Sequence, residues 1–218
     1  MRLKKLLCLA ALVASMASHA GSFEDFFRAV RADNASGVAS LINRGFDPNT
    51  RNETGQTGLL LALREPSPRV IDVLLSSKKT DIDARNANDE SPLMLAALRG
   101  QEDVVRKLIA RDAAVNKPGW TPLHYAATNG QIAIMKLLLE NYAFIDAPSP
   151  NETTPLMMAA MYGSTQGVEL LLAEGADPLL KNQQGMTAAD FAQRGQRPDA
   201  VALLNAAIRA RKPSGGAW

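Results

Sequence analysis

The sequence repeats itself, and the repetition limits the fold more tightly than any other feature. A short segment recurs that opens with Thr or Ser, continues with apolar residues and ends in Ala. Copies begin at residues 57, 91, 121, 154 and 187, a degenerate copy begins at residue 24, and successive starts lie 33, 34, 30, 33 and 33 residues apart. A period of this length is typical of a solenoid, in which each unit buries its apolar face only against its neighbours.

One copy reads as two short helices. A Thr such as Thr121 caps the first helix, and Pro122 stands in its first turn, where no amide partner is missed. An apolar pair lies 17 and 18 residues after each of the first five starts and marks the second helix. Glycine stands nine residues after three starts, where we expect a positive φ to end the first helix: Gly100, Gly130 and Gly163.

These motifs resemble the ankyrin repeat family. The resemblance rests on Thr-Pro-Leu-His-Tyr-Ala at 121–126, on Gly-Ala-Asp at 175–177 and on the 33-residue step, and it covers roughly residues 23–211. It implies an all-α ankyrin repeat solenoid of about six helix-turn-helix repeats, stacked in an L shape with projecting loop fingers. It also implies protein binding through the finger tips and the concave face of the first helices.

Residues 1–20 have the pattern of a secretory signal peptide. Three basic residues precede an apolar run over residues 6–13, and Ala20 is the small residue after which we expect cleavage. The apolar run is too short to span a membrane. The expected organisation is therefore a signal peptide over 1–20, a repeat domain over 21–211 and a disordered tail over 212–218. The expected location is the bacterial periplasm, with secretion as the alternative and a cytosolic chain with an uncleaved N-terminus as a third.

Removal of residues 1–20 leaves a nearly neutral chain with little reactive chemistry. Its 21 basic and 22 acidic residues give no electrostatic reason to expect nucleic acid or an anionic membrane as partner. The single cysteine, Cys8, and one of the two histidines, His19, leave with the signal. A thiolate nucleophile or a Cys/His metal site is then excluded, and a Ser/His/Asp triad would depend on His124 alone. We expect a monomer that is not an enzyme and has no cofactor and no metal.

His124 stands at the fourth position of its motif. In the family that the motif resembles, this histidine ties neighbouring loops together through hydrogen bonds with the Thr, here Thr121. We expect His124→Ala to cost about 1–2 kcal/mol, the size of a lost buried hydrogen bond.

The resemblance places the partner-binding residues at the variable positions, just before the capping Thr and just before the glycine of the first helix. These positions are Arg99, Trp120, Thr128, Asn129, Thr153, Met161, Tyr162 and Met186. Exposed Trp, Tyr and Arg are typical of interface hot spots. In the alternative interpretation, Trp120 covers a shortened finger and Tyr162 covers a helix end.

The predicted function is that of a periplasmic scaffold or adaptor that binds another protein. The alternative is an immunity or inhibitor protein that blocks a toxin or enzyme. An acidic concave face would favour that alternative.

Overall fold

The computed structural model describes residues 21–65 and 67–211. These residues form helices joined by turns and loops, and no strand occurs among them, which confirms the all-α fold class. The signal peptide with its cleavage at Ala20 and the tail over 212–218 lie outside the described residues.

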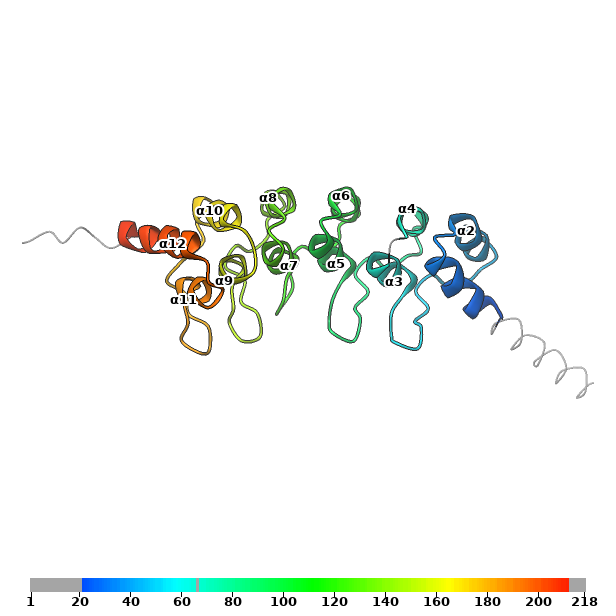
Figure 1. Cartoon of the computed structure of the whole chain (residues 1–218). Helices are drawn as coiled ribbons and strands as arrows, with labels where there is room; N and C mark the ends of the chain where they lie inside the picture. Colours follow the sequence, from blue (N-terminus) through cyan, green and yellow to red (C-terminus); the bar gives the residue numbers. More distant parts are fainter. Residues whose placement is uncertain (1–20, 66, 212–218) are drawn as a thin grey trace, which may run out of the picture. The chain divides into compact units, whose positions relative to one another are not determined.

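Each copy in the sequence corresponds to a pair of helices (Figure 1). The first pair consists of a helix over residues 21–31 and α2 (Ala35–Asn43). The following pairs are α3 (Gly58–Arg64) with α4 (Pro68–Ser76), α5 (Pro92–Arg99) with α6 (Glu102–Ile109), α7 (Pro122–Thr128) with α8 (Ile132–Glu140), α9 (Pro155–Met161) with α10 (Thr165–Ala173), and α11 (Ala188–Arg194) with α12 (Pro198–Arg211).

The chain divides into a first unit that ends at Pro92 and a second unit that begins at Leu93. In the first unit, α4 packs against both α2 and α3. Phe26 is fully buried there, and its ring stacks on that of Phe46 with 4.5 Å between the centroids. A side chain at Gly58 would collide with the Phe26 ring. Copy two therefore has Thr-Gly where copies four and five have Thr-Pro and copy three has Ser-Pro.

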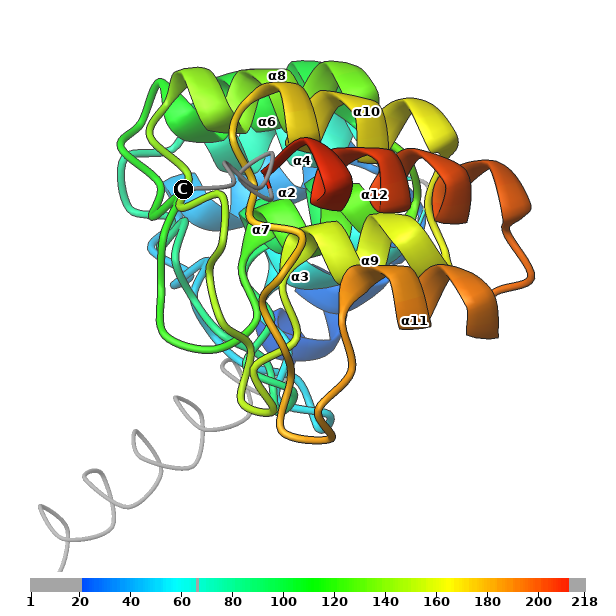
Figure 2. The same ribbon diagram turned by 90° about the vertical axis from the view of Figure 1, so that its left-hand side faces the viewer.

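The second unit has two layers of helices (Figure 2). The first helices α7, α9 and α11 pack side by side, and α6, α8, α10 and α12 form the other layer. The apolar residues predicted from the repeat fill the space between the layers, and Leu108, Leu123, Leu138, Leu156 and Leu171 are fully buried. Each helix pair thus buries its apolar face against the pairs beside it.

Capping threonines begin the first helices as the sequence indicates. The hydroxyl oxygens of Thr57, Thr154 and Thr187 each accept the backbone N–H three residues later, at 3.4 Å. In the last copy Asp190 completes a capping box, since its Oδ2 accepts the N–H of Thr187 at 2.7 Å. These reciprocal bonds satisfy amides at the helix start that have no partner within the helix.

The prediction for the glycines holds for two of the three. Gly100 and Gly130 have φ values of +70° and +61°. The prediction of a positive φ is wrong for Gly163, since it is not among the residues with positive φ. A Cβ at Gly163 would run into the carbonyl oxygen of Ala127 and the backbone of Ala159. Close approach of two helix pairs therefore requires glycine there.

The finger loops share one turn. Asn52, Asn86 and Asn182 each accept, through Oδ1, two backbone N–H groups that lie two and four residues later. Ser149 takes the equivalent place before α9, where its Oγ accepts the N–H of Thr153 at 3.0 Å. The loop before α7 is visibly shorter than the loops before α9 and α11 (Figure 1). Copy four thus has the shortened finger that its 30-residue step indicates.

Candidate functional site

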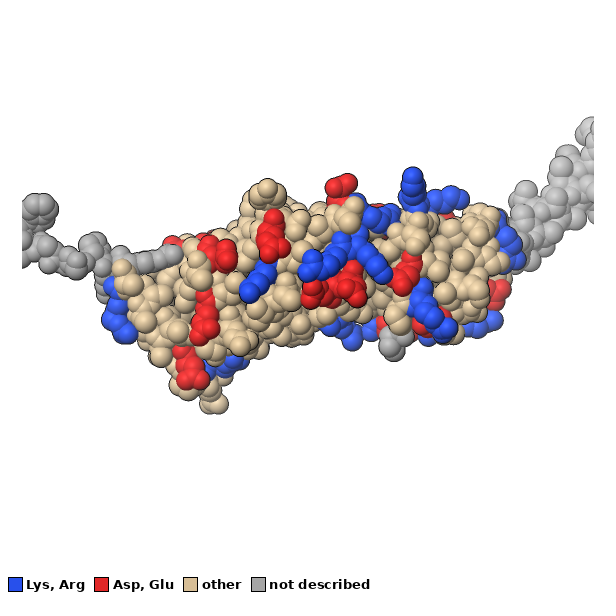
Figure 3. All heavy atoms as spheres, turned by 90° about the horizontal axis from the view of Figure 1, so that it is seen from above, with Lys and Arg blue, Asp and Glu red and all other residues tan. Residues whose placement is uncertain are grey.

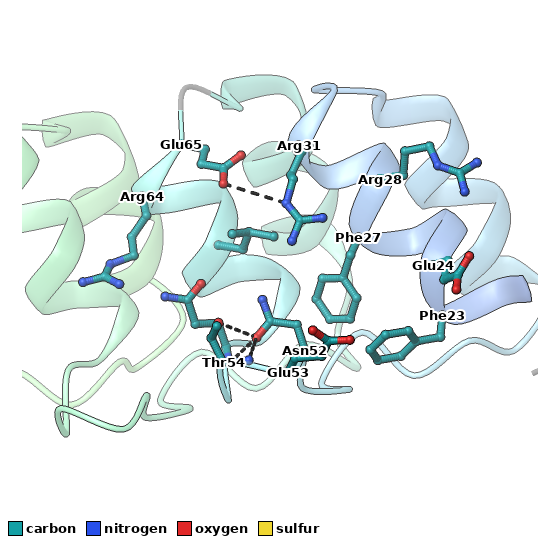
Figure 4. A pocket seen from close by; sticks show the side chains of 12 residues that line it. Phe23, Glu24, Phe27, Arg28, Arg31, Asn52, Glu53, Thr54, Arg64 and Glu65 are labelled. Atoms are coloured by element: carbon teal, nitrogen blue, oxygen red, sulfur yellow. Dashed lines mark hydrogen bonds and ion pairs between the residues drawn. The ribbon is translucent and has the colours of Figure 1, made fainter. Parts of the chain in front are cut away.

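A hollow of about 660 Å³ lies on the first unit, between the helix over residues 21–31, α3 and the loop over residues 52–56 (Figure 4). We call it the groove. Its lining combines aromatic rings, three arginines and three glutamates: Phe23, Glu24, Phe27, Arg28, Arg31, Asn52, Glu53, Thr54, Gln56, Leu61, Arg64 and Glu65. Helices supply two walls and a finger loop supplies the third, so the backbone around the hollow is largely fixed by secondary structure.

Aromatic rings form the apolar part of the groove. The rings of Phe23 and Phe27 meet edge to face with centroids 5.0 Å apart, and Phe27 meets the buried Phe26 in the same manner at 5.2 Å. Phe23 is half-buried, while Phe27 is only 3% exposed. The first copy lacks the Thr-Pro motif but uses its phenylalanines to build a firm apolar floor, continued by Leu61 of α3.

Three guanidinium groups surround this floor, and each has a carboxylate within 4.0 Å. Arg31 Nε lies 4.0 Å from Glu65 Oε1, too far for a hydrogen bond. Arg64 lies 3.6 Å from Glu90 outside the lining, and Arg28 pairs with Asp25 on the outer side of its helix. Their side chains are 54%, 42% and 70% exposed, in the order Arg31, Arg64, Arg28. Planar, partly exposed guanidinium groups are well suited to bind carboxylates of a partner.

Charges of both signs alternate around the groove. Arg31 lies beside Glu65, and Arg28 lies on the same side as Glu24 (Figure 4). Three arginines and three glutamates balance formally, so the groove is not acidic. The groove therefore lacks the acidity that would have favoured an inhibitor.

Sequence reasoning missed the groove although the repeat contained the signal. Gln56 stands just before the capping Thr57, and Arg31 and Arg64 stand seven residues after their copy starts. These are the variable positions that the family resemblance marks, but we applied them only to later copies. Copy one lacks the Thr-Pro start, and copy two lacks the glycine that marks these positions in the later copies.

Trp120 stands between the shortened finger and the start of α7. It is half-buried, and its ring meets that of His124 edge to face at 5.2 Å. Lys117 Nζ donates to its carbonyl oxygen at 3.3 Å. These contacts give Trp120 a structural role and leave part of its ring accessible.

The other predicted partner-binding residues of the second unit fall into three groups. Arg99, Asn129 and Tyr162 are exposed, and Tyr162 is 56% exposed. Half-buried are Thr128, Met161 and Met186. The prediction is wrong for Thr153, because this residue is only 2% exposed. Its backbone N–H donates to Ser149 Oγ and its carbonyl oxygen accepts from His124.

Two of these residues also make structural bonds. Asn129 Nδ2 donates to the carbonyl oxygen of Leu98 at 2.9 Å and so joins two adjacent copies. Thr128 Oγ1 donates to the carbonyl oxygen of His124 within α7 at 2.8 Å. A substitution at either position would change the fold's own contacts as well as any interface.

His124 is fully buried and hydrogen-bonded at both ring nitrogens. Nδ1 accepts the backbone N–H of Thr121 at 3.1 Å, so the proton lies on Nε2, which donates to the carbonyl oxygen of Thr153 at 2.9 Å. The Thr121 hydroxyl lies 2.9 Å from Nδ1, as the resemblance implies. Burial lowers the pKa of His124 to about 4, although the bond to Thr153 opposes the shift. The imidazole is neutral at pH 7 and joins two loops.

Neither a metal site nor a membrane-spanning helix is found in the part of the chain that the structure describes. No group of three or more His, Cys, Asp or Glu side chains is arranged to hold a metal ion there. None of the helices in the same residues combines the length and the apolar character needed to cross a bilayer.

Comparison with known proteins identifies the repeat. A family model described as ankyrin repeats in three copies matches residues 26–117, 59–149 and 143–212. The mouse nuclear factor NF-kappa-B p105 subunit is 36% identical over 145 residues, which are 63% of this chain and 15% of that protein. The chain spans less than a fifth of the length of the first curated relatives it matches.

Two solved structures have the same fold. One is a chain in the complex of the Bdellovibrio bacteriovorus predatory endopeptidase Bd0816 with immunity protein Bd3460, at 28% identity and a TM-score of 0.72. The other is an ankyrin repeat domain from Acinetobacter baumannii, at 24% identity and a TM-score of 0.72. In both cases the similarity covers 84% of this chain and 97% of the other.

Proposed function

The chain belongs to the ankyrin repeat family, and from this premise we propose that it is an exported, non-enzymatic protein that binds a partner protein through the groove of its first unit. The family's repeats bind other proteins. The observation that carries the proposal is the groove itself, where variable positions of the repeat place guanidinium groups around an aromatic floor. Such a preformed surface costs little ordering entropy on binding.

Arg31→Glu tests the role of the groove. Arg31 is half-exposed and has no hydrogen bond to its acidic neighbour, so reversing its charge should leave the fold intact. We expect the full chain to lose at least about tenfold in affinity for its purified partner, since a lost charge-assisted contact is worth about 1.5–3 kcal/mol. Lys78→Glu, an exposed charge reversal in the same unit, is the matched control. Equal affinities of the two variants would refute binding through the groove.

Export is part of the proposal and has its own test. The basic, apolar and small-residue segments of residues 1–20 support it. Cell fractionation with mass measurement of the chain should find a periplasmic protein that begins at Gly21. A cytosolic chain of full mass would contradict export and leave the groove proposal standing, whereas a mature chain in the medium would favour secretion.

An inhibitory role is the second candidate. It is supported by the similarity to a chain in the complex of an endopeptidase with an immunity protein, although the groove is not acidic. The partner should be captured from a periplasmic extract and its hydrolytic activity measured with and without the full chain. Loss of activity on addition of the chain would favour inhibition, and unchanged activity would favour an adaptor.

A further inference from the structure

Four large apolar side chains project into solvent from two neighbouring loops of the second unit. Tyr142 is 86% exposed and Phe144 is 67% exposed in the loop between α8 and α9, while Leu179 and Leu180 are 50% and 37% exposed in the loop between α10 and α11. We call these residues the apolar patch. None of them occupies a position predicted to bind the partner, and none lines the groove.

Hydrogen bonds tie the first of these loops to the loop before α7 and to the second loop, and so fix the patch. Asn116 donates to the carbonyl oxygen of Tyr142 at 2.7 Å and accepts the N–H of Phe144 at 2.8 Å. Asp146, two residues further on, accepts the N–H of Asp177 at 3.1 Å, and Asp177 in turn accepts the N–H of Leu179 at 3.0 Å. The loops run beside each other in both ribbon views (Figures 1 and 2). The patch is thus presented on a rigid backbone.

Tyr142 carries a conformational cost that the fold does not require. Its φ is +63°, in the left-handed region that bulky residues avoid. The position 33 residues later in the repeat is Gly175, with a φ of +100°. At 86% exposure the tyrosine ring buries almost nothing to offset this strain. Its neighbour Phe144 likewise stands where the next copy has Asp177.

Carboxylates lie at the helix ends from which the two loops leave. Glu140 and Glu174 are exposed at the C-terminal ends of α8 and α10. Neither helix has a basic residue in its last turn, so the negative helix ends add to the carboxylate charge, while Lys136 one turn earlier in α8 and Lys181 in the second loop are also exposed. Acidic side chains gather over α10 in Figure 3, whereas over α8 an acidic side chain lies beside a basic one. The two helix ends beside the patch are therefore negative.

We propose that Tyr142, Phe144, Leu179 and Leu180 form a second docking surface, for a protein segment whose apolar side chains are flanked by lysine or arginine. The exposed rings and leucines supply apolar area, and the carboxylates select a basic rim on the partner. The same carboxylates would repel an anionic lipid surface. They would also repel each other if two copies of the chain met through this face.

The double variant Tyr142→Gly/Phe144→Ser tests the proposal, because it removes both rings without adding a charge and gives residue 142 the glycine that copy five has there. Two synthetic amphipathic peptides serve as probes, one of leucine and lysine and one of leucine and glutamate. We expect the full chain to bind the lysine peptide and the double variant to bind it at least about tenfold more weakly. Gln166→Ala, which changes an exposed residue of α10 in the same unit, should bind like the unaltered chain.

The melting temperature separates binding from folding. Relief of the left-handed strain should leave the double variant at least as stable as the unaltered chain. A large loss of stability would overturn the proposal, because the two side chains would then be part of the core.

Other outcomes would also overturn it. These are equal binding of the lysine peptide by both proteins, or equal binding of the glutamate peptide by the unaltered chain. Vesicles of phosphatidylcholine and phosphatidylglycerol test for a lipid surface. If they bound the unaltered chain but not the double variant, the patch would bind lipid and not a protein segment. A concentration-dependent dimer abolished by the double variant would instead assign the patch to self-association.

Discussion

At the scale of single residues, His124 makes stability depend on pH. Its pKa is about 4 in the folded chain and about 6.5 in the unfolded chain, so the unfolded state takes up the proton first as the pH falls. The stabilisation is complete above pH 6.5 and is lost progressively toward pH 4. We expect the free energy of unfolding to fall by about 2 kcal/mol between pH 7 and pH 5, measured by urea denaturation.

His124→Met provides the control, because Met94 and Met157 occupy the same position in adjacent copies. Met157 shows that the substitution fits, since its sulfur accepts the N–H of Thr154 at 3.4 Å. The variant should lose most of the pH dependence between pH 7 and pH 5. An unchanged slope would show that another group titrates in this range.

Gly163 is also explained by its immediate surroundings. A Cβ there would meet the backbone of Ala127 and Ala159, so Gly163→Ala should cost about 1–3 kcal/mol. Gly163→Asn should be no better, although asparagine tolerates positive φ. Gly185→Asn is the control, with a φ of +74° and open space around it. If the Gly163→Asn variant had a clearly higher melting temperature than the Gly163→Ala variant, the close-approach explanation would be wrong.

At the scale of elements, side-chain bridges between loops hold adjacent copies in register. Asn116 bonds both the carbonyl oxygen of Tyr142 and the N–H of Phe144. Asn116→Ala should therefore lower the free energy of unfolding by about 1–2 kcal/mol, in chemical denaturation. Gln166→Ala on the exposed face of α10 should change it by less than about 0.5 kcal/mol. Equal effects would mean that the bridge contributes nothing.

The helix pairs could be predicted from the sequence because each copy repeats its own local signals. Thr154 and Pro155 are local signals that begin α9, and Leu171 stands at the apolar position that recurs in each copy and is buried. The strained φ of Tyr142 and the close approach at Gly163 could not be predicted in this way. They depend on how adjacent pairs meet, which no single copy encodes.

The candidate site was less predictable than the fold. The repeat phase marks which positions vary, but it does not say which of them face solvent. Thr153 occupies a variable position and is buried, with its carbonyl oxygen bonded to His124, whereas Arg31 occupies one in the degenerate first copy and lines the groove. Exposure is decided by finger length and by the neighbouring aromatic rings.

At the scale of the whole molecule, the central claim is that this ankyrin repeat protein acts by holding a partner in the groove of its first unit. Hydrogen–deuterium exchange of the full chain with and without its purified partner tests the claim most directly. Bound partner should slow exchange over residues 23–31 and 52–65, the segments that line the groove. Unchanged exchange rates in both segments when the partner is bound would contradict the account.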